Sequence, residues 1–571
     1  MDTNSGKLFP TKKEISKAIH AFSYAEMFLF IIFIAGFLVS LFLILDKINE
    51  KYLMERPISG GQIKEGVIGS PRFINPVLAS SNTDRDLTTV VFSGLMKKSV
   101  SGEMQEDLAA NYTKSEDGQT YTFTIKDNAF FHDNTKVTSE DVVFTINQIK
   151  DGKLKSPYQA AWQNVVVRRI DEKTVEFKLT SPYTSFLENT SVGILPSYLW
   201  RELDTDDFTF SDLNIYAIGS GPYKISNVEK KKNGLIESIT LASFKNYSGS
   251  RAYIDKIKFV FFKNEADLIK SFRKNKIDQI NAISGEQAKI LESEGESLIN
   301  IKLSRIFGIF LNANKQDIFR NKNVVKAIDL SINKDEIVDL VLGGYGKTIN
   351  SPIPSKIYDN QTVVNQERQA NLEEAKTILD KEGWVMQSDG LRKKDGKNLT
   401  FSISTGDANE LQKAVEVIRN NLKEVGILAE VKVFEIGNLN QSIIRPREYE
   451  SLFFGQIISN ESDLFAFWHS SQRNDPGLNI ASYTNIKVDG LLEKILASKD
   501  QAEKDKYFQE LEKEINQDRP AIFIYSPDFI YLMDKNVKNV IIDKINTPSE
   551  RLNHVNDWYI RTEKVWKFIN K

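Results

Sequence analysis

Cysteine is absent from the 571 residues of the chain, and histidine occurs only four times. The lack of cysteine excludes disulfides, thiolate metal sites, cysteine nucleophiles and a lipid anchor on cysteine. A basic surplus is also missing, because 75 Lys and Arg stand against 77 Asp and Glu, a formal net charge of −2. This balance argues against a nucleic-acid-binding protein, whose phosphate partner usually demands excess positive charge.

Long apolar runs are also scarce, with one exception near the start of the chain. Residues Met27 to Leu45 read MFLFIIFIAGFLVSLFLIL, in which only Gly36 and Ser40 are not strongly apolar. A helix of this length covers most of a hydrocarbon core about 30 Å thick, at about 1.5 Å per residue. We expect residues 27–45 to be a transmembrane anchor and not a buried core helix.

The orientation of this anchor follows from the flanking charges. Basic residues precede the span at Lys7, Lys12, Lys13 and Lys17 and follow it at Lys47, Lys51 and Arg56. The positive-inside rule slightly favours a cytoplasmic segment 1–26, with the larger C-terminal part outside the cytoplasm. The residues Ile15, Ala18, Ile19 and Phe22 either lie along the membrane face or extend the anchor.

The remainder of the chain has the composition of a globular protein, with 41% hydrophobic residues and 15 prolines. Its length allows about three or four domains at roughly 150 residues each. Residues 46–62 are polar and end in Ser59-Gly60-Gly61, which predicts a short tether before a folded part near Ile63.

Periodicity predicts an α/β fold. Residues 121–125 alternate apolar and polar side chains as a half-buried strand does, and Thr138 with Asp141 resembles a capping box that opens a helix. Two strand–helix–strand units are predicted, over 256–262, 265–274 and 277–283, and over 399–404, 408–425 and 427–434. Gly426 would end the second helix, and a charged helix pair is expected over 488–516. The two separated units imply two α/β lobes.

Candidate catalytic motifs are weak. Gly343 to Thr348 resembles the end of a phosphate-binding loop but lacks its first glycine and follows a predicted helix, so a helix C-cap is expected. The pair His132-Asp133 is expected in a surface turn, because neighbouring residues of an extended segment point to opposite faces. His469 has no second histidine or cysteine nearby. We therefore predict no catalytic residue, no metal site and no cofactor.

Ordered motifs along the chain resemble those of the family 5 extracellular solute-binding proteins, the oligopeptide- and dipeptide-binding components of ABC importers. They are Ile74-Asn75-Pro76, Val91-Phe92-Ser93-Gly94-Leu95, Asp107-Leu108-Ala109, Asp117 to Phe123, Phe131-His132-Asp133, Thr138 to Val142, Gly219 to Tyr223, Leu311-Asn312, Val325 to Ile328, Ile332 to Lys334, Val341 to Gly343, Trp468-His469-Ser470, Asn479, Tyr483, Asn485 and Val488-Asp489. The resemblance covers about residues 63–560.

This resemblance implies a two-lobed periplasmic-binding-protein-like fold, of type II and similar to cluster C, with an inserted domain and a ligand enclosed between the lobes. The family layout predicts lobe I over 63–96, 215–303 and 526–571, the inserted domain over 97–214 and lobe II over 304–525. The implied function is capture of peptides, here by a membrane-anchored monomer, for delivery to ABC permease subunits with cytoplasmic ATPases.

The family binds extended peptides through their main chain, a form of β-augmentation. The corresponding positions are Ser80, Ser81 and Asn82 on lobe I and Gly455, Gln456 and Ile457 on lobe II. Gln456 and Ser459 stand where peptide-binding members carry a tryptophan and an aspartate that receives the peptide α-amino group. Asp463 is the candidate substitute for that aspartate. Pocket-lining and core roles are both open for the aromatic residues Phe465, Phe467, Trp468 and Tyr483.

Three functions remain open from the sequence. The first is the importer component, for peptides or for another solute carried by the same fold. The second is a peptide-binding sensor or chaperone-like protein, and the third is a membrane-anchored hydrolase, which the lack of a nucleophile and metal set disfavours.

Overall fold

The computed structural model describes residues 11–180, 186–354, 368–475, 477–498, 500–542 and 544–566. The chain divides into two compact units. One contains the N-terminal part up to Ile58 together with the segment that starts at Arg561, and the other spans Ser59–Ile560.

The first unit contains α1 (Lys12–His20) and α2 (Tyr24–Tyr52), followed by β1 (Leu53–Ile58) and, from the other end of the chain, β24 (Arg561–Trp566). Within α2, the 24 residues Tyr24–Lys47 are apolar and long enough to cross a membrane. At about 1.5 Å per residue they span about 36 Å. Helix α2 is the one such helix in the part of the chain that the structure describes, and it is consistent with the predicted anchor.

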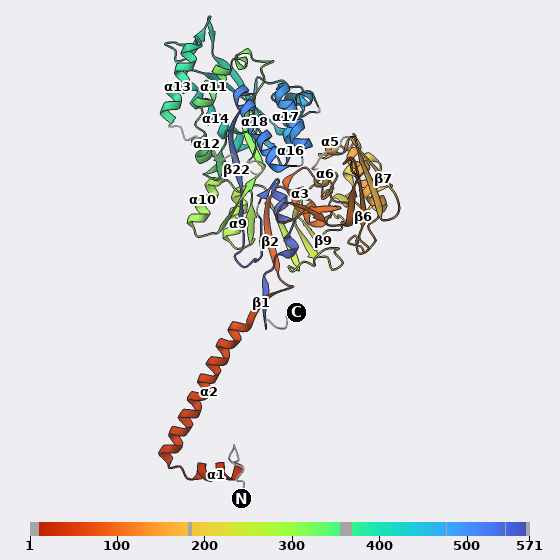
Figure 1. Ribbon diagram of the computed structural model, residues 1–571, viewed down its shortest axis with the longest axis vertical. Coiled ribbons are helices and arrows are strands. Elements are labelled where there is room, and N and C mark those ends of the chain that lie inside the picture. Colours follow the sequence, from red (N-terminus) through yellow and green to blue (C-terminus); the bar gives the residue numbers. More distant parts are fainter. Residues whose placement is uncertain are drawn as a thin grey trace. The chain divides into compact units, whose positions relative to one another are not determined.

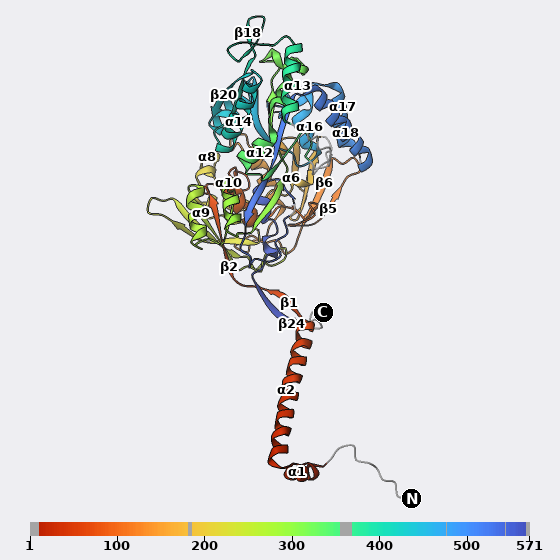
Figure 2. The same cartoon turned by 90° about the vertical axis from the view of Figure 1, so that its left-hand side faces the viewer.

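Strands β1 and β24 form a two-stranded antiparallel ribbon, which Figure 2 shows in red and blue. Leu53 pairs with Trp566 at one end and Ile58 pairs with Arg561 at the other. The sequence predicted a polar tether over 46–62, but these residues mostly complete α2 and form β1. Only Ser59, Gly60 and Gly61 separate β1 from the next strand. Gly61 has φ +91, a conformation that glycine adopts without strain.

The second unit is built on a sheet network of thirteen strands among the described residues. We call its first part the lobe I sheet, in the order β22–β12–β2–β11–β10–β9, with β13 and β23 beside it. Its strands are β2 (Gln62–Ile68), β9 (Tyr223–Lys230), β10 (Ile236–Ser243), β11 (Lys256–Phe262), β12 (Gln279–Asn281), β13 (Leu298–Leu303) and β23 (Lys544–Ile545).

The second part, the lobe II sheet, has the order β20–β19–β21–β14–β22, with β15 paired to β22. Its strands are β14 (Arg305–Leu311), β15 (Gly346–Thr348), β19 (Thr400–Gly406), β20 (Leu428–Phe434) and β21 (Ser451–Ile457). The long strand β22 (Ala521–Leu532) belongs to both sheets.

The chain passes between the two sheets at two places. Residues 521–525 of β22 pair with β14 of lobe II, whereas residues 528–532 pair with β13 of lobe I. Figure 1 shows β22 continuing from the region of α14 toward α9 and α10. Similarly, Ser304 alone separates β13 from β14. Two such crossings allow the lobes to move without unfolding. The predicted lobe boundaries at 303/304 and 525/526 fall at these crossings, although the complete domain division stays a prediction.

Helices cover both sheets. In lobe I they are α3 (Asn82–Val91), α9 (Glu265–Arg273), α10 (Gly285–Ser293), η5 (Pro548–Leu552) and η6 (Val555–Asp557). In lobe II they are η2 (Asp317–Arg320), α11 (Lys322–Ser331), α12 (Lys334–Leu342), α13 (Arg368–Lys381), α14 (Asn409–Glu424), α15 (Ile436–Asn438), η3 (Leu439–Ile444), α16 (Glu461–Trp468), η4 (Ser470–Gln472), α17 (Ile486–Ala497) and α18 (Gln501–Asp518). A small sheet of β16 (Val385–Met386), β17 (Arg392–Lys394) and β18 (Lys397–Asn398) completes the described elements there.

The lobe II sheet is buried on both faces. Ile309 and Leu311 of β14 belong to one hydrophobic cluster, whereas Ile306 and Phe310 belong to another on the opposite face. This alternation follows from the period of two along a strand. Both strand–helix–strand units, the glycine-terminated α14 and α12, and the helix pair α17–α18 confirm their sequence predictions.

Between α3 and β9, the chain forms a four-stranded antiparallel sheet in the order β5–β6–β8–β7. The elements of this region are β3 (Met96–Lys98), β4 (Met104–Glu106), β5 (Ala109–Lys114), β6 (Thr120–Ile125), α4 (Ser139–Lys150), α5 (Gln159–Trp162), β7 (Val165–Arg169), β8 (Thr174–Leu179), α6 (Phe186–Asn189), α7 (Ser197–Trp200), α8 (Thr205–Phe210) and η1 (Asp212–Asn214). The predicted capping box is present, since the Thr138 backbone N–H donates to Asp141 Oδ2 at 2.8 Å.

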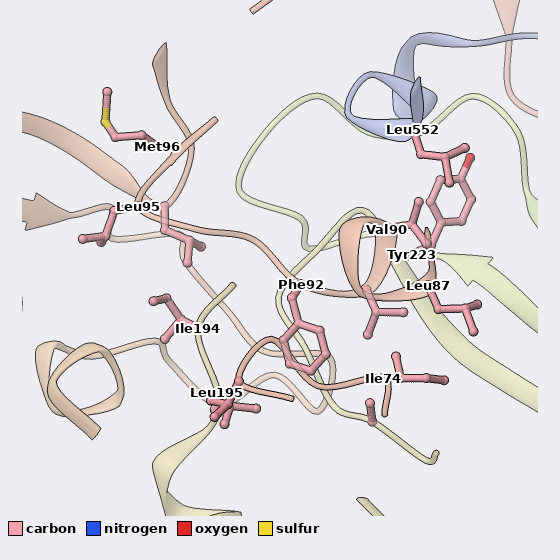
Figure 3. Close-up of a cluster of buried hydrophobic side chains, with 14 of the residues drawn as sticks. Ile74, Leu87, Val90, Phe92, Leu95, Met96, Ile194, Leu195, Tyr223 and Leu552 are labelled. Carbon is pink, nitrogen blue, oxygen red and sulfur yellow. The ribbon is translucent and has the colours of Figure 1, made fainter. Parts of the chain in front are cut away.

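A continuous hydrophobic cluster joins this region to lobe I. Figure 3 shows Phe92, just after α3, between Leu87 and Val90 of α3 on one side and Ile194 and Leu195 on the other. The last two belong to the stretch between α3 and β9, which we call the inserted region. All five side chains are buried. The packing fixes the orientation of α3, and the opposite face of this helix is left to line a cavity.

Lobe I also contains a buried ionic network around Arg551 of η5. Its guanidinium donates to both oxygens of Asp86 in α3, each at 2.8 Å, and to Glu65 of β2. The other Glu65 oxygen accepts from Gln279 Nε2 at 2.6 Å and from the Tyr531 hydroxyl at 2.7 Å. Burial alone would lower the pKa of Arg551, but the two carboxylates hold it well above its usual value. The network joins five segments of lobe I, namely η5, α3, β2, β12 and β22.

Candidate ligand-binding cleft

A cavity of about 940 Å³ lies where lobe I, lobe II and the inserted region meet. Lobe I contributes Arg85, Thr88 and Thr89 from α3, and Asn546, Thr547, Ser549, Glu550 and Asn553 from η5 and the residues that flank it. The inserted region contributes residues between Tyr158 and Gly193, and lobe II contributes Ile457, Ser459, Asn460, Ser462, Asp463 and Phe465. A volume at the upper end of the usual 300–1,000 Å³ range can enclose a sizeable ligand.

The wall from lobe I is one face of α3. Arg85, Thr88 and Thr89 are three and four positions apart, so they share a face, while Leu87 and Val90 point into the core. The helix begins at Ser81, whose Oγ accepts from the Asp84 backbone N–H at 3.1 Å. Arg85 Nε is buried and has no hydrogen-bond partner in the described parts of the chain.

A second arginine lies close to Arg85. Arg305 begins β14 next to the crossing at Ser304. Burial, followed by the charge of Arg85, lowers the pKa of Arg305, whereas Glu410 at the start of α14 opposes that shift. Arg85 lines the cavity whereas Arg305 does not, so the guanidinium of Arg85 supplies a positive charge at this end of the cleft.

The wall from lobe II is built around the start of α16. Asn460 caps the helix, accepting from the Asp463 backbone N–H at 3.2 Å. In return, Asp463 Oδ2 accepts from the backbone N–H groups of Ser459 at 2.7 Å and of Asn460 at 3.3 Å. Burial raises the pKa of Asp463, and the nearby Glu188 adds to this rise while Lys98 opposes it.

Opposite charges meet across the cleft beside Asp463. Lys98 of β3 lies 3.5 Å from Glu188 of α6 and 3.6 Å from Glu550 of η5. These four side chains come from lobe I, the inserted region and lobe II, and three of them are carboxylates. This part of the cleft therefore favours a cationic group.

One edge of β21 is open beside the cavity. Its residues Gly455, Gln456 and Ile457 pair with Phe307, Ile306 and Arg305 of β14 on one side. On the other side, β19 pairs only with Ser451 and Leu452. In the described residues no strand pairs with 453–457 along that edge, and Ile457 lines the cavity. An extended chain could add to such an edge through its backbone.

Of the residues predicted from sequence, the structure places Ile457, Ser459, Asp463 and Phe465 at the cavity. Ser80, Ser81 and Asn82 are exposed at the start of α3 and do not line it. Their proposed main-chain contacts with a ligand stay a prediction.

The other predicted positions lie in or near the lobe II core. Gln456 is 3% exposed, and neither its Nε2 nor its Oε1 has a hydrogen-bond partner in the described residues. Trp468 is 1% exposed and packs against Phe310 and Phe523. The Tyr483 hydroxyl donates to Asp518 Oδ2 at 2.6 Å. None of these three side chains is among those that line the cavity, so ligand roles for them also stay predictions.

Several lining residues carried no signal in the sequence. Arg85, Lys98, Glu188 and Glu550 come from four separate segments, and only the folded chain brings them to one cavity. The sequence indicated the cavity only in the segment 457–465, where Asp463 stands near the position of the missing family aspartate.

His132 is buried rather than exposed in a surface turn as the sequence predicted. Its Nδ1 accepts from the Gly219 backbone N–H at 3.2 Å, and its Nε2 lies 3.1 Å from the Gly221 carbonyl oxygen. Burial lowers its pKa to about 4. The neutral ring therefore fastens the inserted region to the loop before β9, which is a structural role.

Two lobes joined by paired crossings, with a cavity between them, define a protein that encloses a solute. The chain belongs to the bacterial extracellular solute-binding proteins, family 5, whose middle-region model matches residues 103–476. Members of this family are solute-binding proteins and not enzymes.

Known relatives resemble most of the chain. The oligopeptide-binding protein AppA of Bacillus subtilis is 24% identical over 516 residues, which cover 88% of this chain and 92% of AppA. The structure of AppA from Bacillus subtilis with a nonapeptide has a TM-score of 0.71 at 23% identity and covers 89% of this chain and 100% of its own. NikZ from Campylobacter jejuni, in complex with Ni(L-His), has a TM-score of 0.69 at 22% identity, covering 87% and 99%.

Proposed function

We propose that this protein is a membrane-anchored substrate-binding component of an ABC importer that captures peptides, in particular oligopeptides. The observation that carries the proposal is the cavity of about 940 Å³ between the lobes, with the open edge of β21 beside it. The kinship with AppA, an oligopeptide-binding protein, supports a peptide as the ligand.

The open edge suits recognition of the ligand main chain. A peptide strand beside residues 453–457 would lie about 4.8 Å from β21 and bond to its backbone. The side chains of an extended peptide alternate in direction and would enter pockets on either side of its main chain. The backbone hydrogen bonds would supply the affinity, so peptides with different side chains would be accepted. Weak sequence preference follows from this arrangement.

Asp463 would receive the α-amino group of the bound peptide. Its carboxylate is buried at the cavity, and one oxygen is already held by the backbone of Ser459 and Asn460. Burial raises the pKa of Asp463. An ammonium group beside the carboxylate would lower this pKa again, because the opposite charge stabilises the ionised form. This role replaces that of the aspartate absent at Ser459.

The apolar helix α2 would keep the binding unit at the cell surface. In the proposed single-pass topology, α1 lies on the cytoplasmic side and Ser59–Ile560 lies outside the cytoplasm. A monomer tethered beside its permease meets that partner at a high effective concentration. The cytoplasmic ATPases of the importer would then act on the captured peptide through the permease.

The test is native mass spectrometry of the full chain, extracted from membranes in detergent and analysed before and after denaturation. Release of peptides of varied sequence is the expected result. Release of a single defined compound or of a metal chelate would show that the ligand is another solute and not a peptide. Association of the protein with a permease and an ATPase after cross-linking in membranes distinguishes an importer component from a peptide sensor.

The substitution Asp463→Asn tests the amino-group subsite. We expect a loss of affinity of about 10- to 100-fold for peptides with a free N-terminus, because a charge-assisted hydrogen bond contributes about 1.5–3 kcal/mol. The asparagine retains an oxygen that can cap α16. Isothermal titration calorimetry with free and N-acetylated peptides gives the measurement.

Asp317→Asn is the matched control, since Asp317 is 85% exposed and lies outside the cavity. It should leave both affinities unchanged. Equal weakening of free and N-acetylated peptides by Asp463→Asn would remove Asp463 from the proposed role.

A further inference from the structure

The N-terminal helix α1 is separate from the apolar helix α2. Residues 21–23 interrupt the helix, and α2 begins with a capping box of its own. The backbone N–H and the Oγ of Ser23 donate to Glu26 Oε2 at 2.8 and 2.7 Å, and the Glu26 N–H donates back to Ser23 Oγ at 3.4 Å. Because a separate helix N-terminus is capped at Ser23, α1 is not a continuation of α2.

The two helices also differ in direction. Figures 1 and 2 both show α1 turned across the end of α2. Phe22, in the turn, lies against Phe30 of α2 with ring centroids 5.6 Å apart. If α2 crosses the bilayer, α1 ends close to the point where the apolar span starts and lies across the axis of α2, at the depth of the membrane surface.

The residues of α1 separate into two faces. Ile15 and Ala18 are three positions apart on one side, whereas Lys13, Ser16, Lys17 and His20 have the spacing of the other. All six are exposed, and Ile15 has 45% of its surface accessible. An exposed apolar face opposite lysines is the pattern of a helix that lies in a membrane interface.

We propose that α1 is an in-plane membrane-surface helix that binds anionic lipid headgroups. The net positive charge of α1 indicates an anionic partner, because its nine residues contain Lys12, Lys13 and Lys17 but only one acidic residue, Glu14. Phosphate-bearing anionic lipids complement that charge, while Ile15 and Ala18 enter the boundary of the acyl chains. The proposal rests on the anchor role proposed for α2, but not on the identity of the ligand in the cleft.

Site-directed spin labelling of the full chain tests this proposal. Because the chain has no cysteine, Ala18→Cys, Ser16→Cys and Ser40→Cys each provide one unique labelling site. The first two replace small residues on opposite faces of α1, and the third lies in α2. The labelled proteins are reconstituted in vesicles of phosphatidylcholine with one quarter phosphatidylglycerol, and accessibility to oxygen and to a water-soluble nickel chelate is measured.

We expect the label at position 18 to be protected from the nickel chelate at least threefold better than the label at position 16. In pure phosphatidylcholine, this difference should shrink. Two equally accessible labels would place α1 in water, and two equally protected labels would place it within the bilayer. Either result overturns the proposal, as would a difference that does not depend on the anionic lipid.

The label at position 40 reports on the anchor separately. Protection there, without a difference between positions 16 and 18, refutes only the surface helix. Exposure of position 40 to water refutes the anchor that the proposed function assigns to α2. Neither result depends on peptide binding.

Discussion

Gln456 is the residue whose burial most needs an explanation. Its amide lies in lobe II with both polar atoms unpaired among the described residues, and such an atom costs about 1–3 kcal/mol. The neighbouring main chain, by contrast, lies on the strand with the open edge. The effect of the Gln456 side chain on stability can therefore be measured separately from the effect of its backbone on ligand binding.

The substitution Gln456→Met should raise the free energy of unfolding by about 1 kcal/mol, because it removes an unpaired amide at similar volume. Peptide affinity should stay unchanged, since the proposed contacts use the backbone. Urea denaturation and calorimetry provide the two measurements. Gln509→Met, at an exposed position of α18, should change neither. Loss of affinity in Gln456→Met alone would show that the amide itself contacts the ligand.

His132 gives a prediction for pH. Its folded-state pKa is about 4, below the ordinary value of 6.5, so the unfolded chain binds a proton between these pH values while the folded chain does not. Stability is therefore unaffected above pH 6.5 and falls as the pH drops toward 4. The shift corresponds to a loss of about 3 kcal/mol.

The variant His132→Gln should show a smaller loss of stability than the wild type between pH 6.5 and 4, as measured by urea denaturation at each pH. His20→Gln, at an exposed position of α1, should follow the wild-type profile. Parallel profiles for His132→Gln and the wild type would contradict the burial of a neutral ring.

At the scale of elements, the ionic network of Arg551 holds η5 against α3 and β2. We expect Arg551→Met to lower the free energy of unfolding by about 3–5 kcal/mol, because it leaves Glu65 and Asp86 buried without their cation. The matched variant Arg168→Met breaks an ion pair whose arginine is 63% exposed. It should cost less than about 1 kcal/mol.

The triple variant Arg551→Met with Glu65→Gln and Asp86→Asn separates charge from packing. It should recover part of the lost stability, because no buried charge then lacks a partner. Chemical denaturation measures all three proteins. If the triple variant is no more stable than Arg551→Met, the packing of the guanidinium on Phe529 and Tyr531 is the larger contribution.

Local elements were predictable where one segment holds the whole signal. The alternation in 121–125 gave β6, and the apolar face and Gly426 gave α14 with its end. The strand β1 was missed, because its partner β24 lies about 500 residues away and its own sequence, LMERPI, contains a proline and lacks the alternation of a half-buried strand. His132 was misplaced for the same reason, since Gly219 and Gly221 bury it from a distant loop. The cleft was predictable only through Ile457, Ser459, Asp463 and Phe465, which are close in sequence.

At the scale of the whole molecule, the division into two units predicts separable behaviour. Removal of residues 561–571 deletes β24, the partner of β1, but leaves the unit Ser59–Ile560 complete. We expect peptide affinity to be unchanged and digestion by proteinase K within 53–58 to become at least tenfold faster, because an unpaired strand loses its backbone hydrogen bonds. Mass spectrometry of the fragments locates the cut.

A variant with Lys564→Ala keeps the backbone pairing and serves as the control for the truncation. Its digestion should match that of the full chain. A truncated protein that resists the protease equally would show that β1 needs no partner, and one that loses peptide affinity would show that the two units depend on each other.

The pairing of β1 with β24 sets an order of events during synthesis. Strand β1 follows directly after α2, whereas β24 lies near the other end of the sequence. The ribbon can therefore close only after the roughly 500 residues between β1 and β24 have been synthesised, when both lobes have emerged and begun to fold. Until β24 has been synthesised, β1 has no partner strand, so the ribbon forms later than the two lobes that lie between its strands in the chain.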